Sequence, residues 1–424
     1  MADDDLLARL VHGHTVPSAR LVGGNEVRLL QGGDELFPRM EQAIGAAERE
    51  VWLATYIFHD DEAGRRVADA LVAAAGRGVA VHVVIDGFGS HQSLERVRRW
   101  LEVPGLQFEV FRPVDRWWSW LMPGQLRRLH QKLCVADAAV AFVGGINVID
   151  DRHDLGHGPL DRPRLDFAVS VSGPLVDAVR TTAQAMWTRA HLGHQWRDEM
   201  RALTGSSDPV SQARRLIRRL RGQPEPGALA EPMAPMRAAF VVRDNVRQRR
   251  AIERAYVNAI RSARTRIDIA VPYFYPGRVF RRSLRQAARR GVHVRLLLQG
   301  RIDYRIAALA ARALYAELRG HGVRIFEYTH AFLHAKVAVV DDDWATVGSS
   351  NIDPLSLLLN LEANVVVQDA DFSRTLAQRF EQAFAVSTEV DAVQRSGWRG
   401  SLQRGLVAWC ANLYLRLAGI TGRY

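Results

Sequence analysis

The chain of 424 residues is long enough for two ordinary domains that each bury a core. Its formal net charge of +11 predicts an anionic partner, and charge alone does not decide between an acidic lipid surface and nucleic acid. Its two cysteines, Cys134 and Cys410, form neither a CxxC pair nor a disulfide framework, which excludes a fold that depends on disulfide bonds. We expect Cys134 to fill the core rather than to act as a nucleophile.

The amino-terminal segment MADDDLLARL is acidic and lacks the basic and apolar regions of a signal peptide. No apolar run reaches the length of about 18 residues that a membrane-spanning helix needs, so we expect any membrane contact to be peripheral.

Strands and helices alternate along the first half of the chain. We expect strands at 27–30 and 50–58 with a helix between them that begins near Asp34. A helix over 64–75 then precedes a strand at 79–86. This order predicts an α/β fold.

The second half repeats the order of the first. We expect a helix over about 245–261, a strand at 266–273, a helix over about 277–290 and a strand at 292–299. The segments RGVAVHVVIDG from Arg77 and RGVHVRLLLQG from Arg290 match almost residue for residue. A duplication therefore covers most of the chain. The expected parts are a first half at 1–196, a basic proline-rich linker at 197–237, a second half at 238–403 and an apolar, arginine-ringed tail at 404–424.

One stretch in each half carries the residues for chemistry. These are HQKLCVADAAVAFVGGIN, from His130, and HAKVAVVDDDWATVGSSN, from His334. Lys132 and Lys336 are the only lysines in the chain, and they stand at matched positions of the two stretches. Because the chain uses arginine almost everywhere else, a compact ammonium group is evidently required at these two places.

The spacing of these residues predicts an anion-binding cavity. In a strand, residues two apart share a face and lie about 6.5–7 Å apart, so each His would point with its Lys into one cavity. Two imidazoles and two ammonium groups would then surround one anion with a nucleophile and a proton donor. Phosphodiester chemistry requires this combination.

The pattern HxK, Asp, Gly-Gly or Gly-Ser and Asn, present twice, resembles the duplicated motif of the phospholipase D superfamily. The resemblance implies two duplicated α/β/α domains, each with a mixed β-sheet flanked by helices, related by a pseudo-two-fold axis with the active site between them. It implies a catalytic set drawn from both motifs: His130, Lys132, Asp137, His334, Lys336 and Asp341. No metal or other cofactor is expected, because paired imidazoles of opposite protonation suffice.

The resemblance also implies roles. One histidine forms a covalent phosphohistidine and the other acts as acid and base. By analogy we assign His130 as the nucleophile and His334 as the acid and base, although the symmetry of the repeat allows the reverse. The phosphate-binding residues would be Asn147, Asn351 and Ser349; the first motif has Gly145 in place of the serine. We expect Asp137 and Asp341 to brace the motif rather than to touch the substrate.

An acid follows each motif at a matched position: Asp166 in the first half and Glu362 in the second. In the phospholipase D superfamily an acid in this place binds the far nitrogen of the motif histidine and fixes its tautomer. We expect each acid to orient the histidine of its own half; a charge at a strand edge is the alternative.

Three further segments bear on the partner. The insertion before the first motif carries Trp117, Trp118 and Trp120 with basic flanks, which suits a bilayer interface, although a packed tryptophan cluster is the alternative. The tail at 404–424 could lie in the same interface or pack on the core. The loop with Asp151, His153, Asp154 and His157 looks superficially like a metal site, but a polar substrate rim is favoured.

The run RLHQKLCVADAAVAFVGGINVIDD, its following loop and DFAVSVSGPLV resemble bacterial cardiolipin synthases of the type without amino-terminal transmembrane helices. This implies transfer of a phosphatidyl group between two phosphatidylglycerol molecules, with release of glycerol. It also implies a peripheral location on the bacterial cell membrane, with the anionic phospholipid membrane as partner.

The motif leaves three alternatives to this transfer reaction. A lipid-hydrolysing phospholipase D is the nearest, since the motif does not specify whether water or an alcohol attacks the intermediate. A nuclease would leave the tryptophans and the tail unexplained, so no nucleic acid is expected. A silent membrane-binding protein would need a degraded motif, and neither motif is degraded.

Overall fold

The computed structural model describes residues 20–113, 127–203, 236–243, 248, 250–301, 305–353 and 360–390. The expected membrane loop with Trp117, Trp118 and Trp120, most of the linker and the tail at 404–424 lie outside the described residues. No helix in the described ranges is both long and apolar enough to cross a membrane.

The first half folds around a mixed sheet that has seven strands within the described ranges, in the order β1-β9-β6-β5-β2-β3-β4. Strands β2, β3 and β4 are parallel, and the other neighbours pair antiparallel. The bounds are β1 Glu26–Gln31, β2 Glu50–Thr55, β3 Ala80–Asp86, β4 Leu106–Phe111, β5 Leu133–Ala136, β6 Val140–Gly144 and β9 Phe167–Ser172.

The second half repeats this topology. Its sheet runs β10-β16-β15-β14-β11-β12-β13 in the same order, with β17 added at the far edge. The bounds are β10 Arg237–Arg243, β11 Arg266–Val271, β12 His293–Gln299, β13 Arg324–Tyr328, β14 Val337–Val340, β15 Trp344–Gly348, β16 Glu362–Gln368 and β17 Thr388–Glu389. The predicted duplication is confirmed.

Helices cover both faces of each sheet. On one face of the first sheet, α2 (Gly32–Ala46), α3 (Glu62–Gly76) and α4 (Leu94–Leu101) share a buried apolar cluster with the strands, and α5 (Leu175–Leu203) packs on the other. In the second half the corresponding face is covered by α7 (Ala251–Ser262), α8 (Arg278–Arg289) and α9 (Arg305–Arg319). The other face is covered by α11 (Ala370–Ala385). The predicted α/β fold of two halves, each with a mixed sheet flanked by helices, is confirmed.

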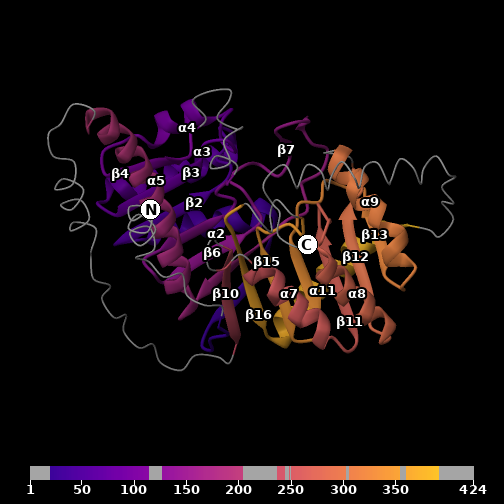
Figure 1. Cartoon of the computed structure of the whole chain (residues 1–424). Helices are drawn as coiled ribbons and strands as arrows, with labels where there is room; N and C mark the ends of the chain where they lie inside the picture. The colour runs from indigo at the N-terminus through magenta and orange to yellow at the C-terminus, as the bar shows by residue number, and fades with distance from the viewer. Residues whose placement is uncertain are drawn as a thin grey trace.

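The two halves meet along their sheets (Figure 1). Strands β6 and β9 lie against β15 and β16, and one apolar cluster contains residues of both sheets together with α5 and α11. Two isolated parallel bridges, Leu129 with Leu361 and Leu165 with Leu333, join the backbone of one half to that of the other. Because this shared core is continuous, the halves hold each other in a fixed register.

Several expected boundaries differ from the structure. The strand expected at 266–273 ends at Val271, and the helix expected over about 245–261 begins at Ala251. The strand expected at 50–58 ends at Thr55, because the fully buried Phe58 leaves the sheet and bridges to Val148 instead. Residues 197–203, expected to begin the linker, continue α5.

The motif aspartates lie in the β5–β6 and β14–β15 turns, at the opposite end of the motif strands from the histidines. Asp137 and Asp341 adopt φ values of 53° and 52°, a left-handed conformation that aspartate tolerates better than most residues. The Asp137 carboxylate accepts hydrogen bonds from the backbone N–H groups of Glu48, Arg49 and Glu50. The Asp341 carboxylate does the same for residues 264–266. In this structure they tie each motif strand to the start of its neighbour and lie away from the motif histidines.

This anchor predicts a pH-dependent loss of stability in Asp341→Asn. Its hydrogen bonds hold the pKa of Asp341 below the ordinary value of 3.8, although partial burial acts in the opposite direction. The stabilisation is therefore present above that value and is lost as the pH falls through the lowered pKa. Asparagine keeps the left-handed turn but not the charge, so we expect a loss of about 1 kcal/mol at pH 7, reduced by solvent screening of this half-exposed carboxylate, that shrinks in acid.

Chemical denaturation of the variant at several pH values measures this loss. Asp342→Asn is the matched control, because that side chain is 88% exposed. An equal effect from the two substitutions, or an effect of Asp341→Asn that does not change with pH, would contradict the anchoring role.

Candidate active site

The two motif histidines are positioned by the backbone of the opposite half. The His130 N–H donates to the carbonyl of Leu361 at 3.0 Å, and the His334 N–H donates to the carbonyl of Leu165 at 2.9 Å. The buried runs of β5 and β14 anchor the following residues in the sheets. Each histidine therefore stands where its strand reaches the boundary between the halves.

The orienting acids are exchanged between the halves. Glu362 Oε2 lies 2.9 Å from Nδ1 of His130, and Asp166 Oδ2 lies 2.6 Å from Nδ1 of His334. The expectation that each acid serves its own half is wrong, because the two parallel bridges place each acid beside the motif of the other half. With Nδ1 engaged by a carboxylate, Nε2 is the nitrogen of each ring that is left for chemistry.

Both motif lysines are buried next to the histidines. Lys132 Nζ donates to the carbonyl of His130 at 2.7 Å, and Lys336 Nζ donates to the carbonyl of His334. The exposed fractions of these lysines are 5% and 0%. Burial lowers the pKa of Lys132 to about 7 and that of Lys336 to about 8. An anion bound beside these lysines would favour their charged forms, so their placement suits the binding of negative charge.

The two orienting carboxylates differ in their electrostatics. Burial raises the pKa of Asp166 to about 6, against the attraction of the Lys336 charge. Burial also acts to raise the pKa of Glu362, but the charges of His130 and Lys132 and a hydrogen bond from Ser349 hold it below its ordinary value. Glu362 is thus the more firmly ionised of the two partners.

The two imidazoles also differ. Burial lowers the pKa of His130, although the Glu362 charge opposes this, and it lowers the pKa of His334 further with the help of the Lys336 and Arg164 charges. The His130 side chain is 12% exposed and the His334 side chain 27%. Both rings are therefore neutral near pH 7 in the free protein, and His334 is the more open one.

Ser349 is found behind the site rather than in it. Its side chain is fully buried, and its hydroxyl donates to Glu362 Oε2 at 2.5 Å. In this structure it therefore supports the carboxylate that orients His130 instead of facing a substrate phosphate. At the matched position in the first half, a Cβ on Gly145 would overlap the carboxylate of Asp166, which explains the difference between the motifs.

The two motif asparagines lie on the loops that follow β6 and β15. Asn147 Oδ1 accepts a hydrogen bond from the backbone N–H of Ile57 at 3.2 Å, which orients its amide group. Asn351 is 7% exposed, and its Oδ1 has no hydrogen-bond partner in the part of the chain that the structure describes. Their role in phosphate binding stays a prediction.

Sequence reasoning missed two neighbours of the site. The Tyr56 ring meets the edge of the His130 ring with 5.0 Å between centroids, and Lys132 Nζ lies 5.4 Å from the centre of the tyrosine ring. Arg164 precedes Asp166 by two residues, and its charge acts on His334. The sequence could have indicated Arg164 through its spacing, because residues two apart in an extended segment share a face and Asp166 is two residues further on.

The acidic and histidine residues of the loop 151–157 have separate partners. Asp151 accepts from the backbone N–H of Gly33 at 2.5 Å, His153 stacks on His59, and His157 Nδ1 lies 2.9 Å from Asp154. Across the described ranges no group of three or more His, Cys, Asp or Glu side chains is arranged to hold a metal ion.

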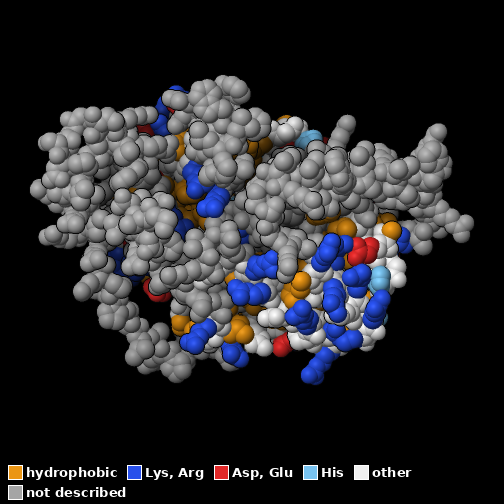
Figure 2. Space-filling model, viewed as in Figure 1, with side chains coloured by type: hydrophobic (Ala, Val, Ile, Leu, Met, Phe, Trp, Pro, Cys, Tyr) orange, Lys and Arg blue, Asp and Glu red, His pale blue; other side chains and the backbone are white. Residues whose placement is uncertain are grey.

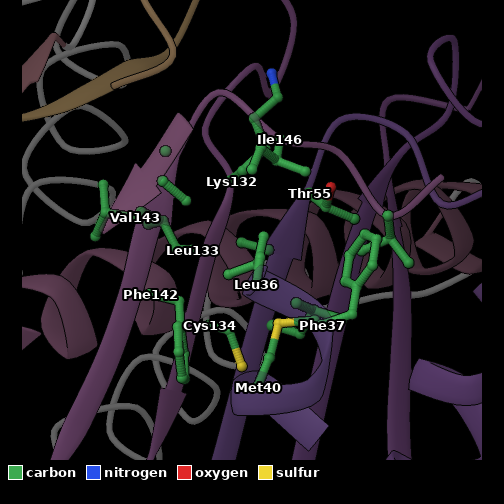
Figure 3. A pocket seen from close by; sticks show the side chains of 15 residues that line it. Leu36, Phe37, Met40, Thr55, Lys132, Leu133, Cys134, Phe142, Val143 and Ile146 are labelled. Carbon is green, nitrogen blue, oxygen red and sulfur yellow. The ribbon is translucent and has the colours of Figure 1, made fainter. Parts of the chain in front are cut away.

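A small cavity of about 20 Å³ lies in the core below Lys132 (Figure 3). Apolar side chains of α2, β5 and β6 line it, and the Lys132 side chain extends away from them. The cavity has room for about one water molecule and is not a substrate site. Cys134 lines it, is 2% exposed, and has a pKa that burial raises to about 12, which matches its expected place in the core.

Comparison with known proteins gives one consistent family. The family described as "Cardiolipin synthase, PLD-like domain" matches residues 40–156 and 256–384. Cardiolipin synthase B of Escherichia coli K12 is 38% identical over 376 residues, covering 86% of this chain and 82% of its own. Cardiolipin synthase A of Pseudomonas fluorescens SBW25 is 33% identical over 392 residues, covering 91% and 74%.

The fold is found in a solved structure as well. Phosphatidylserine synthase of Haemophilus influenzae Rd KW20 superposes with a TM-score of 0.61 over 97% of this chain and 98% of its own, at 12% identity. That likeness supports the two-half architecture.

The exchange of acids predicts which ring responds to which substitution. Glu362→Gln should shift the ¹⁵N resonances of His130, and Asp166→Asn those of His334, because a neutral amide holds an imidazole N–H less firmly than a carboxylate does. Spectra of ¹⁵N-histidine-labelled protein, assigned with His130→Gln and His334→Gln, measure this. A response of His334 to Glu362→Gln with none at His130 would show that the acids serve their own halves.

Proposed function

The chain belongs to the cardiolipin synthase family of PLD-like proteins, and we propose that it transfers a phosphatidyl group from one phosphatidylglycerol to another, giving cardiolipin and glycerol. The observation that carries this proposal is one cationic site with two histidines, each oriented by an acid of the opposite half. Two buried lysines supply its charge.

In the first step, neutral His130 attacks phosphorus through Nε2. A P–N bond forms while the bond from phosphorus to the glycerol oxygen breaks, and His334 gives a proton to that oxygen. The bound phosphodiester raises the pKa of His334 from its low value in the free protein, so that the ring can carry this proton. The products are a phosphatidyl-histidine and free glycerol.

In the second step, a hydroxyl of the acceptor phosphatidylglycerol attacks the same phosphorus. Its proton passes to Nε2 of His334, its oxygen bonds to phosphorus, and the P–N bond to His130 breaks. Cardiolipin leaves, and both histidines return to their starting states. Water in place of the acceptor would give phosphatidic acid instead.

Two differences between the rings support this assignment of roles. The acid and base must exchange protons with groups that leave and enter, and His334 has the larger exposed fraction, 27% against 12% for His130. The nucleophile gains from a firmly ionised partner that stabilises positive charge on its ring, and the pKa of Glu362 is the lowered one.

The buried cations provide the electrostatic part of catalysis. Lys132 and Lys336 neutralise the nonbridging oxygens, and Asn147 and Asn351 donate amide hydrogen bonds to them. Burial has removed water from these ammonium groups, and the negative charge of the bound substrate would stabilise their charged forms in its place. Substrate binding and catalysis therefore use the same interaction.

A membrane-facing role fits the surface charge. Figure 2 shows basic side chains gathered over α7 and α8, and their exposed members are Arg254, Arg261, Arg278, Arg282, Arg289 and Arg290. Near an anionic membrane surface each such residue contributes about 1 kcal/mol. We therefore place the protein peripherally at a bilayer that contains phosphatidylglycerol.

Purified protein incubated with phosphatidylglycerol vesicles and a metal chelator tests the proposal. We expect cardiolipin and glycerol in equal amounts, because the mechanism consumes no water and routes no step through a metal. Phosphatidic acid without cardiolipin would contradict the transfer reaction, and loss of activity on chelation would contradict the metal-free mechanism.

In the same assay His334→Ala should lower turnover by about 10²–10⁴-fold, the usual contribution of a general acid and base. His321→Ala is the control, since that ring lies in the loop after α9 and binds the carbonyl of Glu317. Equal activity of His334→Ala and His321→Ala would remove His334 from the mechanism.

A further inference from the structure

Arg164 lies close in the chain to Asp166, the acid that orients His334. It precedes Asp166 by two residues in an extended segment, so the two side chains share a face. Asp166 reaches His334 at 2.6 Å, and Leu165 between them pairs with the backbone on both sides of Leu333. The Arg164 guanidinium is therefore held at the His334 end of the site, where its charge acts on both His334 and Lys336.

The Arg164 side chain is held by two contacts that do not engage all of its N–H donors. It is 13% exposed, its Nη2 donates to the carbonyl of Asp150 at 3.1 Å, and its Nη1 lies 3.8 Å from Asp154. The other carboxylate oxygen of Asp154 accepts hydrogen bonds from Gly156 and His157. A guanidinium has five N–H donors, so these contacts leave it able to bind an oxyanion.

The second half differs from the first at the position that matches Arg164. The residue two before Glu362 is Asn360, which carries no charge. The nearest counterpart at the His130 end is Arg128, but its guanidinium is directed to Asp86 at 3.9 Å and lies 5.0 Å from the centre of the Phe88 ring. At the His130 end, the buried guanidinium of Arg243 donates to the carbonyl of Asn360. Arg164 therefore adds, beside the orienting acid of His334, a charge that the matched position of the second half does not carry.

The acceptor lipid of the second step has a phosphate group that the Arg164 guanidinium could bind. In the second step the attacking hydroxyl belongs to a lipid that has a phosphate of its own, a few bonds from that hydroxyl. Because the hydroxyl gives its proton to His334, the acceptor's phosphate must also lie near His334. Water and free glycerol lack this second phosphate.

We propose that Arg164 binds the phosphate of the acceptor lipid, so that the site holds one phosphate between the histidines and a second beside His334. This inference rests on the proposed function. As the acceptor oxygen bonds to phosphorus, the P–N bond to His130 breaks and the hydroxyl proton passes to His334, while Arg164 offsets the repulsion between the two phosphates. Arg164 thus selects a lipid acceptor over a neutral alcohol.

The test compares two acceptors in one reaction. Phosphatidylglycerol vesicles are incubated with labelled glycerol, and both cardiolipin formation and incorporation of labelled glycerol into phosphatidylglycerol are measured. Both reactions use His130 and His334, but only cardiolipin formation brings a second phosphate. In Arg164→Gln the ratio of cardiolipin to exchanged glycerol should fall about 10- to 100-fold, the effect of losing a charge-assisted hydrogen bond to a phosphate.

Arg162→Gln is the matched control, because it removes the same charge from the same segment. Its guanidinium binds His330 at 2.6 Å on the exposed rim, and we expect the wild-type ratio. Arg164→Lys keeps the charge without the planar fork, so its ratio should lie between those of Arg164→Gln and the wild type.

The outcomes separate the two hypotheses. An Arg164→Gln variant that loses both reactions equally, or that keeps the wild-type ratio, would overturn the role of Arg164 and leave the proposed function standing. A wild-type protein that exchanges glycerol or forms phosphatidic acid but makes no cardiolipin would contradict the proposed function itself, and the acceptor role of Arg164 with it.

Discussion

The exchanged hydrogen bonds between the halves are the constraint on which the rest of the structure depends. His130 is oriented by Glu362 and His334 by Asp166, so neither half contains a working histidine by itself. A hydrogen bond of this kind requires the two halves to keep their positions within a few tenths of an ångström. The shared apolar core and the two backbone bridges meet this requirement. The packing of the two sheets against each other therefore sets the geometry of both histidines.

A duplicated fold gives two equivalent histidines, whereas the proposed reaction needs two different ones. The structure makes them different through small changes around a conserved backbone geometry. The second half pairs Glu362 with Ser349, where the first half has Asp166 and Gly145. As a result the pKa of Glu362 is lowered and that of Asp166 is raised. Arg164 adds positive charge at the His334 end, where the second half has Asn360. In the proposed mechanism these changes divide the roles of nucleophile and acid without altering the sheets.

Much of this could be predicted from the sequence, because the relevant signals are local. The alternation of strand and helix segments predicted the sheets, whereas the anion-binding cavity expected from the paired histidines and lysines stays a prediction. The exchange of Asp166 and Glu362 could not be predicted, since it depends on how two sheets face each other across a pseudo-two-fold axis. The position of Ser349 behind Glu362 has the same origin: the motif places it near the site, but only the tertiary structure shows which way its hydroxyl points. The end of β2 at Thr55 was missed because Phe58 is as apolar as the strand before it and is buried after the chain has left the sheet.

The most direct measurement of the central claim is to trap the covalent intermediate. Wild-type protein is quenched during turnover with phosphatidylglycerol labelled on phosphorus, and the labelled residue is identified by mass spectrometry under conditions that preserve phosphohistidine. The account predicts label on His130, the ring oriented by the ionised Glu362 of the opposite half. Label on His334 would reverse the roles, and turnover without any covalent label would contradict the two-step mechanism.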